Sequence, residues 1–145
     1  MMLRALDDKV SVAPQITTDD MDALLSEGIV SVICNRPDME VPPELSSGVL
    51  AEHAKSAGLA FANVPLAPGN LTLDTIREQL AAIDAADGPV LAYCASGTRS
   101  AILWAFAMAL ADRMPTQDIL SALERAGYPS PGLAPQLDQV RAMGA

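Results

Sequence analysis

Short apolar runs and longer segments of mixed polarity alternate along most of the chain. Four β-prone apolar runs predict four strands, at Lys9–Ala13, Ile29–Cys34, Leu59–Val64 and Pro89–Tyr93. The run Ile29–Cys34 is almost continuously apolar and rich in β-branched residues, which is the pattern of a strand covered on both faces of a parallel sheet. We therefore expect this strand to be central.

Helical patterns follow the strands. In the segment 72–86, apolar residues recur every three or four positions, as on one face of a helix. Similar spacing or capping signals predict helices over about 17–26, 46–57, 99–112, 116–126 and 133–143. The alternation predicts one α/β domain over residues 1–145, with a parallel sheet of about four to five strands flanked by helices on both faces.

Ligands of parallel sheets bind at the carboxyl ends of the strands. The segments 35–38, 65–70 and 94–100 are therefore the places to look for function, and the last is the most informative. Cys94 directly follows a predicted buried strand and precedes a helix, whose N-terminal amides stabilise a thiolate. The small residues Ala95, Ser96, Gly97 and Thr98 allow the backbone amides to form an anion cradle.

Arg99 closes this loop with a permanently charged, planar fork that suits a tetrahedral oxyanion or a persulfide. Ser100 is placed to cap the helix or to donate a hydrogen bond to the sulfur. The plain alternative is a buried structural Cys94 in an ordinary turn. Since cysteine, glycine and arginine rarely share this register by chance, we predict an enzyme with Cys94 and Arg99 as catalytic residues.

Two interpretations stay open for Arg36 and Asp38, which follow the Cys34 strand. Arg36 either holds an anionic substrate, with Asp38 orienting it or exchanging protons, or the pair stiffens the turn. Cys34 itself is either a core residue or a resolving thiol for an oxidised or persulfidated Cys94.

No metal site and no organic cofactor are predicted. His53 stands alone in a helical segment without a second metal ligand at useful spacing, so we expect a solvated imidazole. Trp104 and Phe106 lie on the apolar helix after the loop, where they either pack against the sheet or expose a patch for a homodimer.

The formal charge of −9 disfavours nucleic acids and anionic membranes as partners. Asp7 and Asp8 interrupt the N-terminal segment before it is long enough for the apolar core of a signal peptide. No apolar run is long enough to span a membrane. We expect a cytoplasmic protein, where both cysteines stay reduced.

The stretch Tyr93–Ser100 resembles the active-site loop of rhodanese-type sulfurtransferases and also the phosphate loop of cysteine-dependent tyrosine phosphatases. Four residues separate Cys94 from Arg99, which is the rhodanese-type spacing, whereas the phosphatases have five. Over about residues 3 to 112, the order of Val32–Asp38, Val64-Pro65, the Cys94 loop and Leu103-Trp104-Ala105 is similar to the phosphatase-like domain of bacterial beta-lactamase-hydrolase-like proteins. This resemblance implies a dual-specificity-phosphatase-like fold, with a rhodanese-like fold as the alternative, and a Cys94 nucleophile.

The reaction has two main candidates. Phosphatases of this kind protonate the leaving group with an aspartate some thirty residues before the cysteine, but the stretch Asn63–Asn70 contains no acid. Tyr93 also stands where such phosphatases commonly have histidine. Sulfur transfer needs only a thiolate, a cationic cradle for the persulfide and an accepting thiol. We therefore predict a sulfurtransferase that uses a sulfane-sulfur donor and a thiol acceptor. A phosphatase and a non-catalytic anion-binding module are the alternatives.

Overall fold

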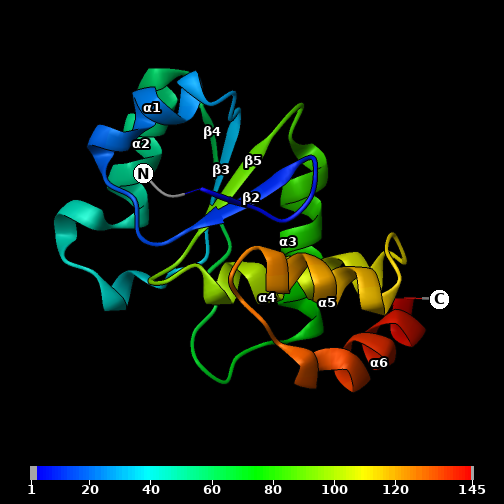
Figure 1. The fold of residues 1–145 in the computed structure, drawn as a ribbon. Coiled ribbons are helices and arrows are strands. Elements are labelled where there is room, and N and C mark those ends of the chain that lie inside the picture. The colour runs from blue at the N-terminus through cyan, green and yellow to red at the C-terminus, as the bar shows by residue number, and fades with distance from the viewer. Residues whose placement is uncertain (1–2, 145) are drawn as a thin grey trace.

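The computed structural model describes residues 3–144, which form a five-stranded sheet covered by helices on both faces (Figure 1). The spatial order is β1-β2-β5-β3-β4, with bounds Arg4–Ala5 (β1), Val10–Ala13 (β2), Ser31–Cys34 (β3), Ala60–Asn63 (β4) and Val90–Tyr93 (β5). All pairs are parallel except β1 with β2. The four predicted strands are confirmed, while β1 is too short to produce a sequence pattern.

The six predicted helices are also confirmed, with ends shifted by at most four residues. They span Met21–Ser26 (α1), Ser47–Ala57 (α2), Leu73–Ala85 (α3), Thr98–Leu110 (α4), Thr116–Arg125 (α5) and Ala134–Gly144 (α6). The predicted first helix is shorter than expected because Thr18–Asp20 forms a separate 3-10 turn. Within residues 3–144, no helix is long and apolar enough to cross a membrane.

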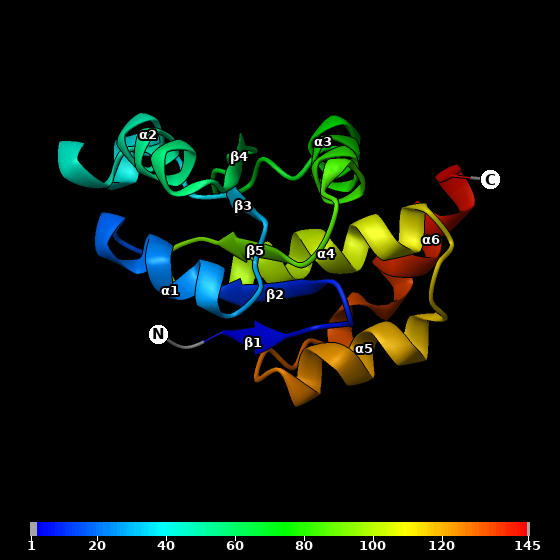
Figure 2. The same ribbon diagram turned by 90° about the horizontal axis from the view of Figure 1, so that it is seen from above.

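Side chains alternate between the two faces of the sheet, as strand geometry requires. On β5, Leu91 and Tyr93 pack with α1 and α2, whereas Val90 and Ala92 pack with α3, α4, α5 and α6. Figure 2 shows these two groups of helices on opposite sides of the strands. The run Ile29–Cys34 supplies an interior strand as predicted, although β5 is the middle one.

The aromatic residues of α4 belong to the core. Trp104 and Phe106 are buried, and the Trp104 indole N–H donates to Asp7 Oδ2 over 2.9 Å. Of the two predicted roles for Trp104 and Phe106, the structure shows the one in the core. His53 is exposed on α2, as predicted.

The parallel strands end at one edge of the sheet. Tyr93 pairs with Ala13 on one side and with Cys34 on the other, and Cys34 pairs with Asn63. The segments that follow β2, β3, β4 and β5 consequently meet at this edge, where the Cys94 loop lies.

Candidate active site

The Cys94 loop joins β5 to α4 and is braced by the segment after β2. The Cys94 backbone N–H donates to the Ala13 carbonyl, and the Gln15 backbone N–H donates to the Ala95 carbonyl, each at a distance of 3.4 Å. Gly97 has φ +94°, a left-handed conformation that side-chain-bearing residues rarely adopt, and it is the N-cap residue directly before α4. The end of β2 and the segment after it thus hold the loop just before the chain enters α4.

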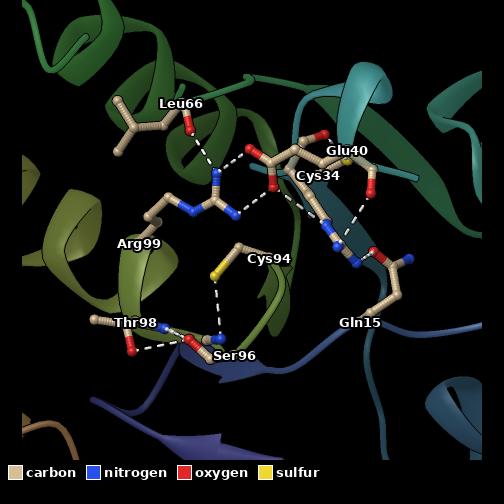
Figure 3. Close-up of polar contacts among 10 residues, drawn as sticks. Gln15, Cys34, Glu40, Leu66, Cys94, Ser96, Thr98 and Arg99 are labelled. Carbon is tan, nitrogen blue, oxygen red and sulfur yellow. Dashed lines mark hydrogen bonds and ion pairs between the residues drawn. The ribbon is translucent and has the colours of Figure 1, made fainter. Parts of the chain in front are cut away.

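The sulfur of Cys94 accepts a hydrogen bond from the Gly97 N–H at 3.0 Å (Figure 3). This donor and the positive end of α4 both stabilise a thiolate over a thiol. Cys94 is completely buried, at 0% exposure, whereas Ala95, Ser96 and Thr98 are exposed. The sulfur therefore lies at the base of the loop, beneath these three residues.

Arg99 is oriented by two acceptors. Its Nη1 donates to Glu40 Oε2 and to the Leu66 carbonyl, both at 2.9 Å, and its Nη2 donates to Glu40 Oε1 at 2.8 Å (Figure 3). These three bonds use three of the five N–H donors of the guanidinium. The Nε–H and one Nη2–H remain for a bound anion.

The ion pair between Arg99 and Glu40 shifts the pKa values of both groups. Hydrogen bonding to Glu40 raises the pKa of Arg99, and the nearby Cys94 sulfur raises it further. Hydrogen bonding to Arg99 lowers the pKa of Glu40 below its ordinary value, and Arg36 adds to the effect. Glu40 is therefore a carboxylate that stays ionised at neutral pH.

Arg36 contacts the same carboxylate from the other side. Its Nε donates to Glu40 Oε1 at 3.3 Å, its Nη2 donates to the Glu40 carbonyl at 3.2 Å and its Nη1 donates to Gln15 Oε1 at 3.2 Å. In this arrangement Arg36 supports Glu40, which in turn supports Arg99. This geometry matches the interpretation of Arg36 as part of an ion-paired turn.

Asp38 does not orient Arg36, in contrast to one of the predicted roles. Its carboxylate accepts from the backbone N–H of Ser47 at 2.8 Å and from the Ser47 hydroxyl at 2.9 Å, at the first residue of α2. Glu40 takes the orienting role, and sequence reasoning missed it. The spacing Arg36-x-x-x-Glu40 was the available signal, but it is informative only when the local backbone is known.

One predicted role of Ser100 was a hydrogen bond to the Cys94 sulfur, but the Ser100 hydroxyl points to another partner. This hydroxyl donates to Asn35 Oδ1 at 2.8 Å, and Asn35 Nδ2 donates to the Val64 carbonyl at 2.9 Å and to Gln79 Oε1 at 2.8 Å. Asn35, Gln79 and Ser100 are all completely buried. This network ties the end of β3 to α3, to α4 and to the segment that presents the Leu66 carbonyl to Arg99.

Cys34 is buried on the face of the sheet that packs against α1 and α2, next to Tyr93. Its thiol donates to the Arg36 carbonyl at 3.4 Å, and burial raises its pKa above the ordinary value. A thiol with a raised pKa is a poor nucleophile, so this environment favours the core interpretation over a resolving thiol.

Metal ligands do not gather at this edge. Across residues 3–144, no group of three or more His, Cys, Asp and Glu side chains is arranged to hold a metal ion. The chemistry available at the site is that of a buried thiol, backbone amides and an oriented guanidinium.

Comparison with known proteins agrees with this architecture. Residues 2–111 match the model of the family described as "Beta-lactamase hydrolase-like protein, phosphatase-like domain". The curated beta-lactamase hydrolase-like protein of Agrobacterium fabrum is 30% identical over 114 residues, which cover 79% of this chain. The matched segment makes up only 26% to 28% of the length of such curated relatives.

Solved structures share the fold over nearly the whole chain. A "putative phosphatase" from Neisseria meningitidis has a TM-score of 0.82 and 30% identity, covering 97% of this chain and 99% of its own. PTPMT1 has a TM-score of 0.76 at 17% identity, covering 98% and 95% of the two chains. The fold is therefore that of the cysteine-dependent phosphatases.

Proposed function

The chain belongs to the family of phosphatase-like domains of beta-lactamase hydrolase-like proteins, and we propose that it is a sulfurtransferase in which Cys94 carries sulfur as a persulfide. The proposal keeps the cysteine nucleophile and the anion cradle of the phosphatase-like fold. It assigns to them a reaction that needs no general acid.

The state of Glu40 is the observation that carries the proposal. Glu40 is the carboxylate in contact with the loop arginine, and its pKa is lowered by Arg99 and Arg36. A group that stays ionised cannot donate a proton to a leaving alcohol at neutral pH. Asp38 is engaged by Ser47, and the segment 63–70 contains no acid. The surroundings of Cys94 thus favour transfer of a group whose departure needs no proton.

The two half-reactions balance without a redox partner. The Cys94 thiolate attacks the outer sulfur of a sulfane donor such as thiosulfate, the donor S–S bond breaks and sulfite leaves with its electron pair. The product is a Cys94 persulfide anion, stabilised by the Gly97 N–H, the helix terminus and the two free donors of Arg99. A thiolate acceptor then attacks the outer sulfur and releases the Cys94 thiolate.

The burial of Cys94 limits the size of the sulfur donor that can reach it. Since the side chain is 0% exposed, the sulfur is reached either by a small donor or after movement of the exposed residues Ala95, Ser96 and Thr98. Thiosulfate is therefore the first donor to test.

Intact-protein mass spectrometry after incubation with thiosulfate tests the proposal. We expect a gain of about 32 Da, the mass of one sulfur atom, which cyanide or excess thiol removes. The variant Cys94→Ser should show no gain, whereas Cys34→Ser should keep it. An unmodified parent protein after treatment with both thiosulfate and a low-molecular-weight persulfide would refute the proposal.

Phosphate-ester hydrolysis is the second candidate, and the similarity in fold favours it. Cys94 would attack phosphorus to form a phosphoenzyme, with a leaving group that departs without help from an aspartate. Aryl phosphates meet this condition because phenolates leave readily. Phosphate release from an aryl phosphate that is lost in Cys94→Ser, together with no sulfur adduct, would establish the phosphatase and exclude the sulfurtransferase.

A further inference from the structure

One peptide group of the Cys94 loop is held from both sides. The N–H of Gly97 donates to Cys94 Sγ at 3.0 Å, and the Ser96 carbonyl of the same peptide group accepts from the Tyr128 hydroxyl at 3.1 Å. The C=O and N–H of a trans peptide point in opposite directions. A donor that fixes the carbonyl on the outside therefore aims the N–H at the sulfur.

Tyr128 is placed by the end of α5. Gly127 has φ +93°, and the amides of Gly127 and Tyr128 donate to the Glu124 and Leu123 carbonyls at 3.0 and 2.8 Å, which closes the helix. Arg4 Nη1 donates to the Ala126 carbonyl at 3.2 Å. Figure 1 shows the segment after α5, in orange, beside the beginning of α4. The tyrosine is thus held by a capped helix end and by β1.

The phenol ring lies directly against the loop glycine. A Cβ atom added at Gly97 would overlap the Tyr128 hydroxyl and would lie 2.9 Å from its Cζ atom. Glycine at position 97 thus serves two purposes: it allows the left-handed φ angle, and it leaves room for the tyrosine.

We propose that Tyr128 is a positioning residue for the Cys94 thiolate, whose hydroxyl holds the Ser96–Gly97 peptide group so that the Gly97 N–H stays aimed at the sulfur. A hydrogen bond to the carbonyl also polarises the peptide and strengthens the bond that its N–H donates. Tyr128 lies outside residues 2–111, the segment that matches the family model. The inference rests on Cys94 being the reactive thiol of the proposed function, but it holds for sulfur transfer and phosphate hydrolysis alike.

The groups around Cys94 allow a pH profile to be interpreted. The Cys94 sulfur contributes to the raised pKa values of Arg99 on α4, Cys34 on β3 and Tyr128 after α5, and Glu40 acts through Arg99. Burial raises the pKa of Tyr128, so its hydroxyl remains a donor through the neutral range. Arg99 and Tyr128 therefore keep constant charges through the neutral range.

The test measures the rate of alkylation of Cys94 by iodoacetamide from pH 5 to pH 10, with peptide mass spectrometry separating Cys94 from Cys34. The variant Tyr128→Phe keeps the ring and removes only the hydroxyl. We expect its alkylation at neutral pH to be about three- to tenfold slower than in the parent, with an unchanged plateau at high pH, because the thiolate loses part of the stabilisation that the aimed Gly97 N–H supplies. Thr116→Val, which changes the end of α5 opposite to Tyr128, should follow the parent profile.

A Tyr128→Phe profile that superimposes on the parent would overturn the inference. So would an equal fall of rate at every pH, since this indicates altered access rather than a less stabilised thiolate. Thermal unfolding of each variant identifies any loss of fold. Because alkylation needs no sulfur donor, a shifted profile without persulfide formation would retain the role of Tyr128 and reject the sulfurtransferase.

Discussion

Replacing Glu40 by glutamine tests the ion-pair arrangement that orients Arg99. The substitution keeps the size of the side chain and removes its charge, so two guanidiniums lose their shared carboxylate. The side chains of Arg99 and Glu40 are only 21% and 25% exposed, and their contacts measure 2.8 and 2.9 Å. Charge-assisted hydrogen bonds of this kind contribute about 1.5–3 kcal/mol, and partial exposure to solvent reduces this to about 1–2 kcal/mol.

We expect Glu40→Gln to lower the free energy of unfolding by about 1–2 kcal/mol at pH 7, which corresponds to a fall in Tm of about 3–8 °C for a chain of this size. The pKa of Glu40 is lowered in the folded protein. Its contribution is therefore fully present above the pKa of the unfolded chain, about 4.3, and is lost as the pH falls through the lower folded value. The difference between parent and variant should be constant from pH 6 to 8 and shrink below about pH 4.5.

Urea unfolding at several pH values measures this difference, with Glu44→Gln as the matched control. Glu44 is an exposed acid in the neighbouring turn, so its replacement should change stability little. Equal stability of Glu40→Gln and parent at pH 7 would refute the reasoning. A difference that persists unchanged to pH 3 would also refute it, because the effect would then come from shape and not from charge.

Three further variants test the parts around Cys94. Asn35→Ala should lower the free energy of unfolding by about 2–4 kcal/mol, measured in urea, because buried Gln79 and Ser100 lose their shared partner. Gly97→Ala should slow Cys94 alkylation at pH 7 at least tenfold, since a side chain at φ +94° strains the loop; an unchanged rate would contradict the geometry. Cys34→Ala should keep the yield and turnover of the persulfide within about twofold, as followed by mass spectrometry; loss of turnover would restore Cys34 as a resolving thiol.

The strands and helices were predictable because each has its own local period, and the Cys94 loop was predictable because its parts are contiguous. The residues that contact the loop could not be predicted in this way. The sequence places Asp38 and Glu40 two positions apart in one turn, and nothing local decides which of them faces the arginines. A 3-10 turn over Asp38–Glu40 accompanies the observed choice, in which Asp38 binds α2 and Glu40 binds Arg99.

Contacts between residues from distant parts of the chain could not be predicted, because no local sequence pattern indicates them. Gln79 lies on the buried side of α3, where a single polar residue resembles an interruption of the apolar face until Asn35 is seen beside it. Tyr128 follows a predicted helix end, and its contact with Ser96 depends on how α5 packs on α4. Both contacts are set by tertiary packing, which local propensity does not encode.

The charge and the hydrogen-bond donors beside Cys94 support the proposed persulfide over a phosphoryl group. Arg36, Arg99 and Glu40 together carry one net positive charge, which matches the single charge of a persulfide better than the dianion of a phosphoenzyme. Phosphoryl transfer spreads charge over three equatorial oxygens, each of which needs donors. The loop has one residue fewer than the phosphatase type it resembles, and Arg99 has two donors free after binding Glu40 and Leu66. One terminal sulfur needs fewer donors than three oxygens, and this difference supports the proposed sulfur transfer by the shortened loop.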